Sequence, residues 1–383
     1  MIVNNPKLFL VSAAVITSFV TSQVNWSLPA QVGLIPCLVT VLFIVSVSLK
    51  RQRVPYEILK SLVLILICLV AAIIFLDSDK VSEALLLLYV TMGMLLIREL
   101  GSRETGKLFK LLGLLAVVAQ SVQALLPNAE YIFFVRPAMA DTTRGFSGFF
   151  SEPSFAAAVL FILWLAVTVL RPRGSQLDRR FSFIVIVGLA LTGSVTGGLY
   201  CAIVVIDMVR LNKKQLQLLA ITSCSVMLLA MLEIGPLRIF STADIVQDVT
   251  RDQSANARYV YFQKDLKYSF DNLLLPAVSY EKAFRNSEWA DFGLQQPMNY
   301  STMTASSIFG YFLVTYGFLT PLALVGFLTY LYNHLARSAN RTKTPVLAGL
   351  LLLSSQMVSL GLYPIGVCIG AIYGVCRYGA KDK

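Results

Sequence analysis

Residues 144–164 read RGFSGFFSEPSFAAAVLFILW. An arginine, a run of glycine, serine and phenylalanine, and a Glu-Pro pair stand directly before an apolar stretch that continues without a charged residue to Leu170. Proline is tolerated in the first turn of a helix, because its missing N–H has no intrahelical partner there. We therefore expect a helix over 153–170 that begins at Pro153, with a polar segment at its entrance.

The whole chain has the composition of a membrane protein. Of its 383 residues, 56% are hydrophobic and 14% are charged, and the mean hydropathy is +0.71. A soluble domain of this size would carry far more surface charge. Apolar stretches long enough to cross a hydrocarbon core of about 30 Å recur along the chain. We predict an all-α polytopic membrane protein, a single transmembrane domain over 1–383, with twelve spans at 8–24, 32–49, 58–76, 82–97, 108–126, 153–170, 181–193, 195–209, 215–233, 304–331, 345–361 and 363–376.

The charges between the spans predict their orientation, because short cytoplasmic loops are rich in Lys and Arg. Basic segments such as KRQR (50–53) and RPRGSQLDRR (171–180) alternate with loops that hold most of the acidic residues. This alternation places both termini in the cytoplasm and the two long segments, 127–152 and 234–303, outside. The net charge of +11 then reflects orientation beside anionic lipid and does not indicate nucleic-acid binding.

Two glycine patterns predict how helices turn and pack. ALTGSVTGGLY (190–200) interrupts an apolar region whose ends are both cytoplasmic by charge, so we expect the chain to turn there between the half-spans 181–193 and 195–209. In the last span, glycines repeat at every fourth position, which indicates close contact with another helix. These glycines are Gly366, Gly370 and Gly374.

The second long segment contains an amphipathic stretch. Helical spacing places four apolar side chains on one face, which suits a helix lying on the outer leaflet or an ordinary helix packed against the bundle. The four are Tyr259, Phe262, Leu266 and Phe270. We expect Lys264 and Lys267, which flank this face, to extend toward lipid phosphates.

Ionisable residues are almost absent from the spans, which disfavours an ion-coupled transporter. Asp207 is the exception, and we expect it to pair with Arg210. His, Cys and acidic residues show no spacing typical of metal ligands, so we expect no metal or other cofactor. All six cysteines fall within predicted spans, which argues against a disulfide framework.

Arginines in the long outer segments are the strongest candidate binding groups. Arg136 and Arg144 share the first segment with Glu152, and Arg258 lies in the second. Arginine binds phosphate through two parallel hydrogen bonds and keeps its charge in a partly dry site, which suits a diphosphate at a membrane surface. Each arginine alone also fits a lipid anchor or surface ion pair, and Glu152 also fits a helix cap.

Three stretches resemble the Wzy-type O-antigen polymerases of bacterial inner membranes. They are RGFSGFFSEPSFAAAVLFILW at 144–164, TGSVTGGLY at 192–200 and NARYVYFQKDLKYSFDNLL at 256–274. The number of predicted spans and the two large outer loops agree with this family. The resemblance implies a multi-pass inner-membrane protein with a GT-C-like arrangement of helices, in which the segments 127–152 and 234–303 are periplasmic loops.

The resemblance also implies an activity. Such an enzyme transfers a growing glycan from undecaprenyl diphosphate to a new undecaprenyl-diphosphate-linked repeat unit of lipopolysaccharide, without a metal or cofactor. Glu152 and Arg144 would be catalytic, whereas Arg136, Arg258, Tyr259 and Tyr300 would bind the diphosphate and sugars. The expected partners are lipid-linked oligosaccharides, membrane lipids and, as a candidate, a polysaccharide chain-length regulator; nucleic acid is not expected.

Three other functions stay open. An O-antigen ligase would join the glycan to lipid A core, but the related ligases carry a histidine before an asparagine where this chain has Met298 and Asn299. A separate departure concerns the small-residue span, where many relatives have Ser-Arg and this chain has Ser194 followed by Val195. A transporter of lipid-linked oligosaccharide would show ion-coupled flux. A scaffold protein would tolerate loss of charge in the outer loops without any change in polymer length.

Overall fold

The computed structural model describes residues 15–16, 39–46, 56–75, 78–125, 146–150, 153–171, 178–209, 264–277, 280–284, 307–337, 343–354 and 363–378. In these ranges every regular element is a helix and no strand occurs, so the all-α prediction is confirmed. The chain forms two compact units. Unit 1 comprises residues 1–208, 325–353 and 358–383, and unit 2 comprises 209–324 and 354–357.

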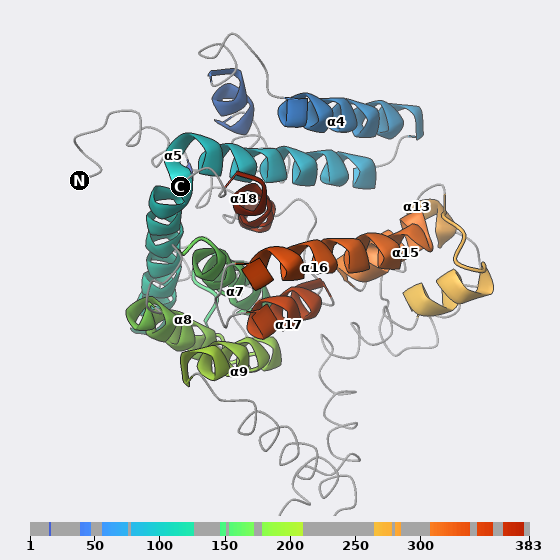
Figure 1. Cartoon of the computed structure of the whole chain (residues 1–383). Helices are drawn as coiled ribbons and strands as arrows, with labels where there is room; N and C mark the ends of the chain where they lie inside the picture. Colours follow the sequence, from blue (N-terminus) through green and yellow to red (C-terminus); the bar gives the residue numbers. More distant parts are fainter. Residues whose placement is uncertain are drawn as a thin grey trace, which may run out of the picture. The chain divides into compact units, whose positions relative to one another are not determined.

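The helices follow the order labelled in Figure 1. Unit 1 contains α4 (Tyr56–Phe75), α5 (Ser78–Leu125), α7 (Pro153–Val169), α8 (Arg179–Leu191), α9 (Val195–Val209), α18 (Tyr363–Tyr378) and most of α16 (Leu319–Arg337) and α17 (Lys343–Ser354). Unit 2 contains α13 (Tyr280–Ala283), α15 (Ile308–Tyr316) and a helix at 264–271.

Helix α7 forms the core of unit 1. It begins at Pro153, as predicted, and residues 156–166 are at most 1% exposed. It packs against α5, α8 and α18. Phe161 stacks on Tyr200 of α9 with ring centroids 4.1 Å apart, and the indole N–H of Trp164 donates to Ser182 Oγ of α8 over 3.1 Å. A helix that is apolar on all sides is expected at such a central position.

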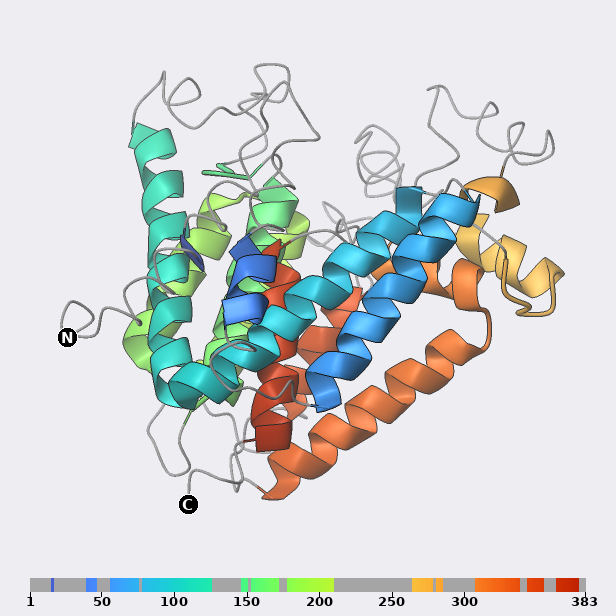
Figure 2. The same cartoon turned by 90° about the horizontal axis from the view of Figure 1, so that it is seen from above.

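Helix α5 contains a sharp corner at Gly101. The sequence predicts two spans, 82–97 and 108–126, and the connection between them is helical on both sides of Gly101. The two halves run in clearly different directions (Figure 2). Gly101 has φ 78° and ψ 166°, a conformation almost restricted to glycine. Thr105 Oγ1 donates to the carbonyl oxygen of Gly101 over 2.9 Å and so stabilises the corner.

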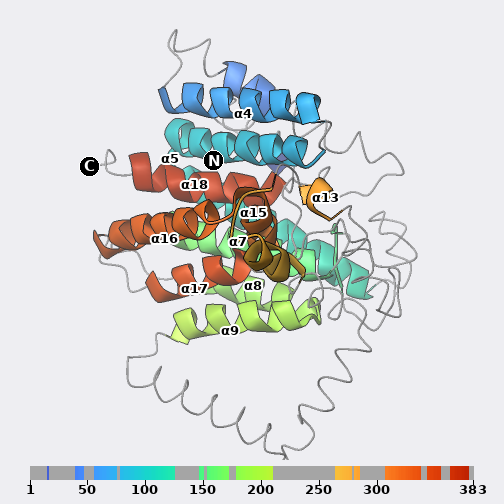
Figure 3. The same cartoon turned by 90° about the vertical axis from the view of Figure 1, so that its right-hand side faces the viewer.

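The first half of α5 packs closely against α18, and α4 covers another side of α5. The three helices follow one another as layers in Figure 3. A Cβ on Gly370 would lie 1.9 Å from the carbonyl oxygen of Val90, and one on Gly93 would lie 2.0 Å from that of Val367. Only glycine permits such an approach of two backbones, so the predicted packing role of the last span's glycines is confirmed.

Few described helices are long enough to test the twelve predicted spans. By length and composition, one helical stretch in the described ranges, Glu83–Leu125, could cross a membrane, and it contains the Gly101 corner. Shorter apolar helices are Leu59–Val70, Pro153–Val169, Thr196–Met208 and Leu319–Asn333. The span count and the placement of the loops on the outer side stay predictions.

The predicted span 304–331 is wrong as a single helix, because it breaks at Gly317 into α15 and α16. Gly317 has φ +57°, and a Cβ there would lie 2.0 Å from the carbonyl oxygen of Leu274. That same oxygen accepts a hydrogen bond from the N–H of Phe318 over 3.0 Å. The break therefore results from a tertiary contact with residues about forty positions earlier, within unit 2.

Candidate functional site

The segment 146–150, the centre of the motif that opens α7, is bound to the last turns of α5. The side-chain oxygen of Gln123 accepts hydrogen bonds from the N–H groups of Ser147 (3.0 Å) and Gly148 (2.7 Å). The side-chain nitrogen of the buried Gln120 donates to the carbonyl oxygen of Phe146 over 3.2 Å. Two glutamines thus hold three consecutive backbone groups of the segment in place.

The same segment is bound to α8. The N–H of Phe146 donates to the carbonyl oxygen of Leu191 over 2.9 Å. Leu191 ends α8, and the turn at 192–194 leads into α9, as the predicted half-spans require. Ser194 Oγ accepts from the N–H of Gly197 over 2.9 Å and so caps the first turn of α9. Two of the three motif stretches therefore meet at one end of these helices.

Small residues allow this close packing. Gly148 has φ +62°, and a Cβ there would lie 3.1 Å from both Cγ and the backbone nitrogen of Gln120. On α8, a Cβ on Gly188 would lie 2.5 Å from Val117 of α5. Phe150 is 1% exposed and its N–H donates to Ser147 O over 3.2 Å, which closes a turn. The segment consequently lies against α5 with its backbone paired.

An ion pair between Lys110 and Asp178 joins the second half of α5 to the start of α8. Asp178 also caps α8 by accepting from the N–H of Phe181 over 3.1 Å. Partial burial by itself would raise the pKa of Asp178, but hydrogen bonds from Lys110 and Phe181 outweigh it and hold the pKa below its ordinary value. The second half of α5 and α8 are therefore antiparallel, with this ion pair at one end and the 146–150 segment at the other.

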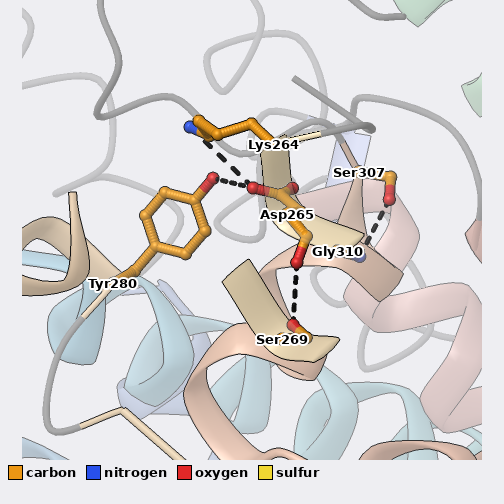
Figure 4. A network of polar contacts seen from close by, with 6 residues as sticks. All are labelled: Lys264, Asp265, Ser269, Tyr280, Ser307 and Gly310. Carbon is orange, nitrogen blue, oxygen red and sulfur yellow. Dashed lines mark hydrogen bonds and ion pairs between the residues drawn. The ribbon is translucent and has the colours of Figure 1, made fainter. Parts of the chain in front are cut away.

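The third motif stretch contributes a buried polar cluster to unit 2. The hydroxyl of Tyr280 donates to Asp265 Oδ1 over 2.6 Å, and Lys264 Nζ lies 3.8 Å from the same oxygen. Ser269 Oγ donates to the carbonyl oxygen of Asp265 over 2.8 Å. Figure 4 shows these contacts together with the Ser307 cap of α15, which accepts from the N–H of Gly310. The side chains of the cluster are at most 1% exposed: Lys264, Asp265, Ser269 and Tyr280.

Lys264 does not extend toward lipid phosphates, so that expectation is wrong. Its ammonium group lies 4.1 Å from the ring centroid of Phe284 and 5.2 Å from that of Tyr280, which are cation–π distances. Burial lowers the pKa of Lys264 to about 8, and the neighbouring Asp265 carboxylate limits this shift. Lys267, on the same helix, is exposed, and its extension toward lipid phosphates stays a prediction.

All the site residues predicted from the sequence lie outside the described residues. They are Glu152, Arg144, Arg136, Arg258, Tyr259 and Tyr300, and Arg210, the expected partner of Asp207, is also outside. In the sequence, Arg144 and Glu152 stand two residues before and two residues after the anchored segment 146–150. The structure therefore describes the centre of the segment that connects these two residues, residues 146–150.

Sequence reasoning missed Gln120, Gln123 and the Lys264–Asp265 pair. The glutamines carried a usable signal, because polar side chains within an apolar helix need hydrogen-bond partners. Their partners are backbone groups of the motif, which spacing alone does not reveal. The sequence gives no sign that Lys264 and Asp265 are buried, since charged residues are usually exposed.

The arrangement in unit 1 can hold a loop in one conformation at the end of a helical bundle. Paired backbone groups and fixed neighbours are what preorganised catalytic sites require. In the described part of the chain, no group of three or more His, Cys, Asp or Glu side chains could hold a metal ion. A scan of the sequence against protein-family models finds no match, and a search of curated protein sequences finds none either.

Proposed function

We propose that this chain is an integral-membrane glycosyltransferase of the O-antigen polymerase type, acting at the outer face of the bacterial inner membrane. One observation carries the proposal: the segment between Arg144 and Glu152 is anchored by Gln120, Gln123 and Leu191. This anchoring occurs at the helix ends that the charge pattern places on the outer side. Two of the three polymerase-like stretches thereby form one structural unit.

The exposed surface of α4 supports the membrane placement. No charged residue occurs from Ser61 to Phe75, and large apolar side chains such as Leu64, Leu66 and Ile67 are at least 50% exposed. Contiguous exposed apolar surface is rare on soluble monomers, whereas lipid accommodates it. In the proposed protein, α4 is one of twelve spans and faces acyl chains.

The proposed reaction needs an activated donor and two kinds of protein group. The acceptor hydroxyl oxygen bonds to the anomeric carbon of the donor glycan, the bond from that carbon to the diphosphate breaks, and undecaprenyl diphosphate leaves. Glu152 orients the hydroxyl and takes its proton. Arg144, with Arg136 and Arg258, stabilises the charge that develops on the diphosphate, and a preorganised donor of this kind contributes about 3 kcal/mol. Tyr259 and Tyr300 contact the sugars.

The anchored segment has a mechanical role in this scheme. If the loop moved freely, Arg144 and Glu152 would occupy many positions relative to each other. Few of these positions would suit in-line transfer. Fixing the connecting backbone reduces this loss of orientation, which is a large part of the barrier for two bound reactants. The glutamines of α5 therefore act through the loop, without contacting substrate.

The test is complementation of a strain that lacks its O-antigen polymerase and supplies the matching repeat unit. Wild type, Arg144→Ala and Glu152→Gln are compared at equal membrane levels, with glycan length measured on gels. We expect a ladder from wild type and single-repeat products from both variants. Lys107→Ala is the matched control, since Lys107 forms a half-exposed ion pair with Glu104 near the Gly101 corner and should leave the ladder unchanged.

The other outcomes identify what is wrong. Failure of wild type to form a ladder contradicts the polymerase proposal. Glycan attached to lipid A core without elongation favours a ligase, and ion-dependent movement of the lipid-linked unit without elongation favours a transporter. Full ladders from both variants would contradict only the roles given to Arg144 and Glu152.

A further inference from the structure

The helix at 264–271 buries three polar side chains and exposes a phenylalanine. Its buried side chains include Lys264, Asp265 and Ser269, each at most 1% exposed, whereas Phe270 is 63% exposed. Amphipathic helices in aqueous surroundings bury the apolar side. The exposed side thus combines Phe270 with the charged Lys267 and Asp271, a mixture suited to a membrane surface.

The turn after this helix presents further apolar side chains. Leu273 and Leu275 are 83% and 61% exposed. Leu273 and Leu274 have φ of 54° and 58°, a left-handed conformation that is unfavourable for leucine. Hydrogen bonds hold the turn, among them the N–H of Leu274 to Ser269 O at 2.7 Å. The fold thus accepts backbone strain to hold a leucine outward.

The turn is joined to the start of α16, where the exposed surface is also apolar. Phe318 N–H donates to Leu274 O over 3.0 Å. Phe318, Leu319 and Leu322 are 50%, 52% and 62% exposed, and they belong to the same unit as the turn. We name these side chains together the apolar knuckle: Phe270, Leu273, Leu275, Phe318, Leu319 and Leu322.

We propose that the apolar knuckle enters the acyl-chain region of the outer leaflet of the membrane. Continuity with α16 favours this occupant, because Leu319 and Leu322 begin the apolar helix Leu319–Asn333, which the proposed topology places in the membrane. Around the turn, Lys267, Asp271 and Asn272 are exposed polar residues, as expected at the level of the headgroups. The inference rests on the membrane placement of the proposed function and is independent of glycosyl transfer.

Insertion explains both unusual features of the segment. Lipid removes the exposed leucines and phenylalanine from water, which offsets the unfavourable φ values of Leu273 and Leu274. The buried Asp265 faces protein, where it accepts hydrogen bonds from Tyr280 and Ser269. The knuckle would keep this part of the long outer segment at the bilayer surface, where a lipid-linked substrate carries its diphosphate.

The experiment measures the surroundings of a fluorescent probe on the full-length protein in vesicles of phosphatidylcholine and phosphatidylglycerol. An environment-sensitive thiol dye is attached to Leu273→Cys and, as the matched polar control, to Asp271→Cys. Labelling of the wild type measures the background from the native cysteines. Lipids carrying a nitroxide on the acyl chain and iodide in the buffer serve as the two quenchers. Leu275→Cys repeats the measurement at a second exposed position.

We expect nitroxide lipids to quench the probe at position 273 at least threefold more than the probe at position 271, with the reverse order for iodide. Equal iodide quenching at the two positions would overturn the inference, because the knuckle would then face water. Protection from both quenchers would also overturn it, because a second copy or another protein would then cover the knuckle.

A third probe on Leu66→Cys separates this inference from the membrane placement. Leu66 is 61% exposed on α4, a predicted span. If nitroxide lipids quench the probe at position 66 but not the one at 273, only the knuckle inference fails. If iodide quenches both, the membrane placement itself fails, whatever the glycan assay shows.

Discussion

The side-chain oxygen of Gln123 lies 2.7 Å from the backbone nitrogen of Gly148, and this hydrogen bond joins the end of α5 to the motif that precedes α7. The same oxygen accepts from Ser147. One side chain thus satisfies two neighbouring N–H groups that would otherwise need water. Its loss would release the centre of the loop that carries Arg144 and Glu152 at its ends.

Gln123→Leu should shorten the glycan ladder strongly, whereas Gln123→Glu should largely preserve it. Leucine leaves two N–H groups without their acceptor, each at a cost of about 1 to 3 kcal/mol if buried, so we expect at least a tenfold fall in polymerisation rate. Glutamate keeps an acceptor oxygen at the same reach. Ladder length and initial rate at equal membrane levels are the measurements. A normal ladder from the leucine variant, or equal loss in both, would show that this hydrogen bond does not position the loop.

Gly148→Ala should reduce both stability and polymer length, whereas Gly101→Ala should reduce stability alone. Both glycines have positive φ, but a Cβ at 148 would press on Gln120 and one at 101 meets nothing within 4 Å. We expect each variant to lose about 1 to 3 kcal/mol of unfolding free energy, because alanine is strained at positive φ. Thermal unfolding in detergent gives stability, and the glycan gel gives polymer length. A short ladder from Gly101→Ala would mean that polymer length follows global stability.

Gly370→Ala should destabilise the contact between α5 and α18, because the new Cβ would lie 1.9 Å from Val90 O and the backbones would have to separate. We expect a loss of about 3 kcal/mol, the upper range for overpacking. Gly198→Ala is the matched control on α9, where nothing lies within 4 Å and alanine favours the helix by about 1 kcal/mol. The two variants should shift the unfolding midpoint in opposite directions. Similar midpoints would argue against this helix contact.

Lys264 predicts that stability rises with pH above about 8. Burial lowers its pKa from the ordinary 10.5 to about 8 in the folded protein. Between these values the unfolded chain binds more protons than the folded one, so raising the pH favours the folded state, in total by something on the order of 3 kcal/mol. Unfolding midpoints in detergent from pH 7 to 9.5 test this. The rise should disappear in Lys264→Met and persist in Lys267→Met, whose lysine is exposed; a rise in both variants would assign it to other groups.

Several elements followed from local sequence. The start of α7 at Pro153, the turn between α8 and α9 and the close packing of α18 all depend on proline or glycine, whose backbone properties act within a few residues. One other expectation failed. The span 304–331 is broken at Gly317, whereas the predicted spans 82–97 and 108–126 meet at the Gly101 corner.

This failure has a tertiary cause. The break at Gly317 is stabilised by the carbonyl oxygen of Leu274, which accepts from the N–H of Phe318. This contact outweighs the apolar pattern that favours a straight helix. Hydropathy reports how much apolar surface a segment has and does not report where its backbone bends.

The sequence by itself determined that this protein is helical and rich in membrane-type segments, because composition and apolar periodicity depend only on which residues are present and in what order. It also located the motif around Arg144 and Glu152. Only the tertiary structure decided that Gln120 and Gln123 hold that motif's backbone, that Lys264 is buried beside Asp265, and that leucines of the following turn are exposed. The glutamines contact residues more than twenty positions away, and Lys264 is buried against the rings of Tyr280 and Phe284. The energy of such contacts depends on burial and distance that no local pattern contains.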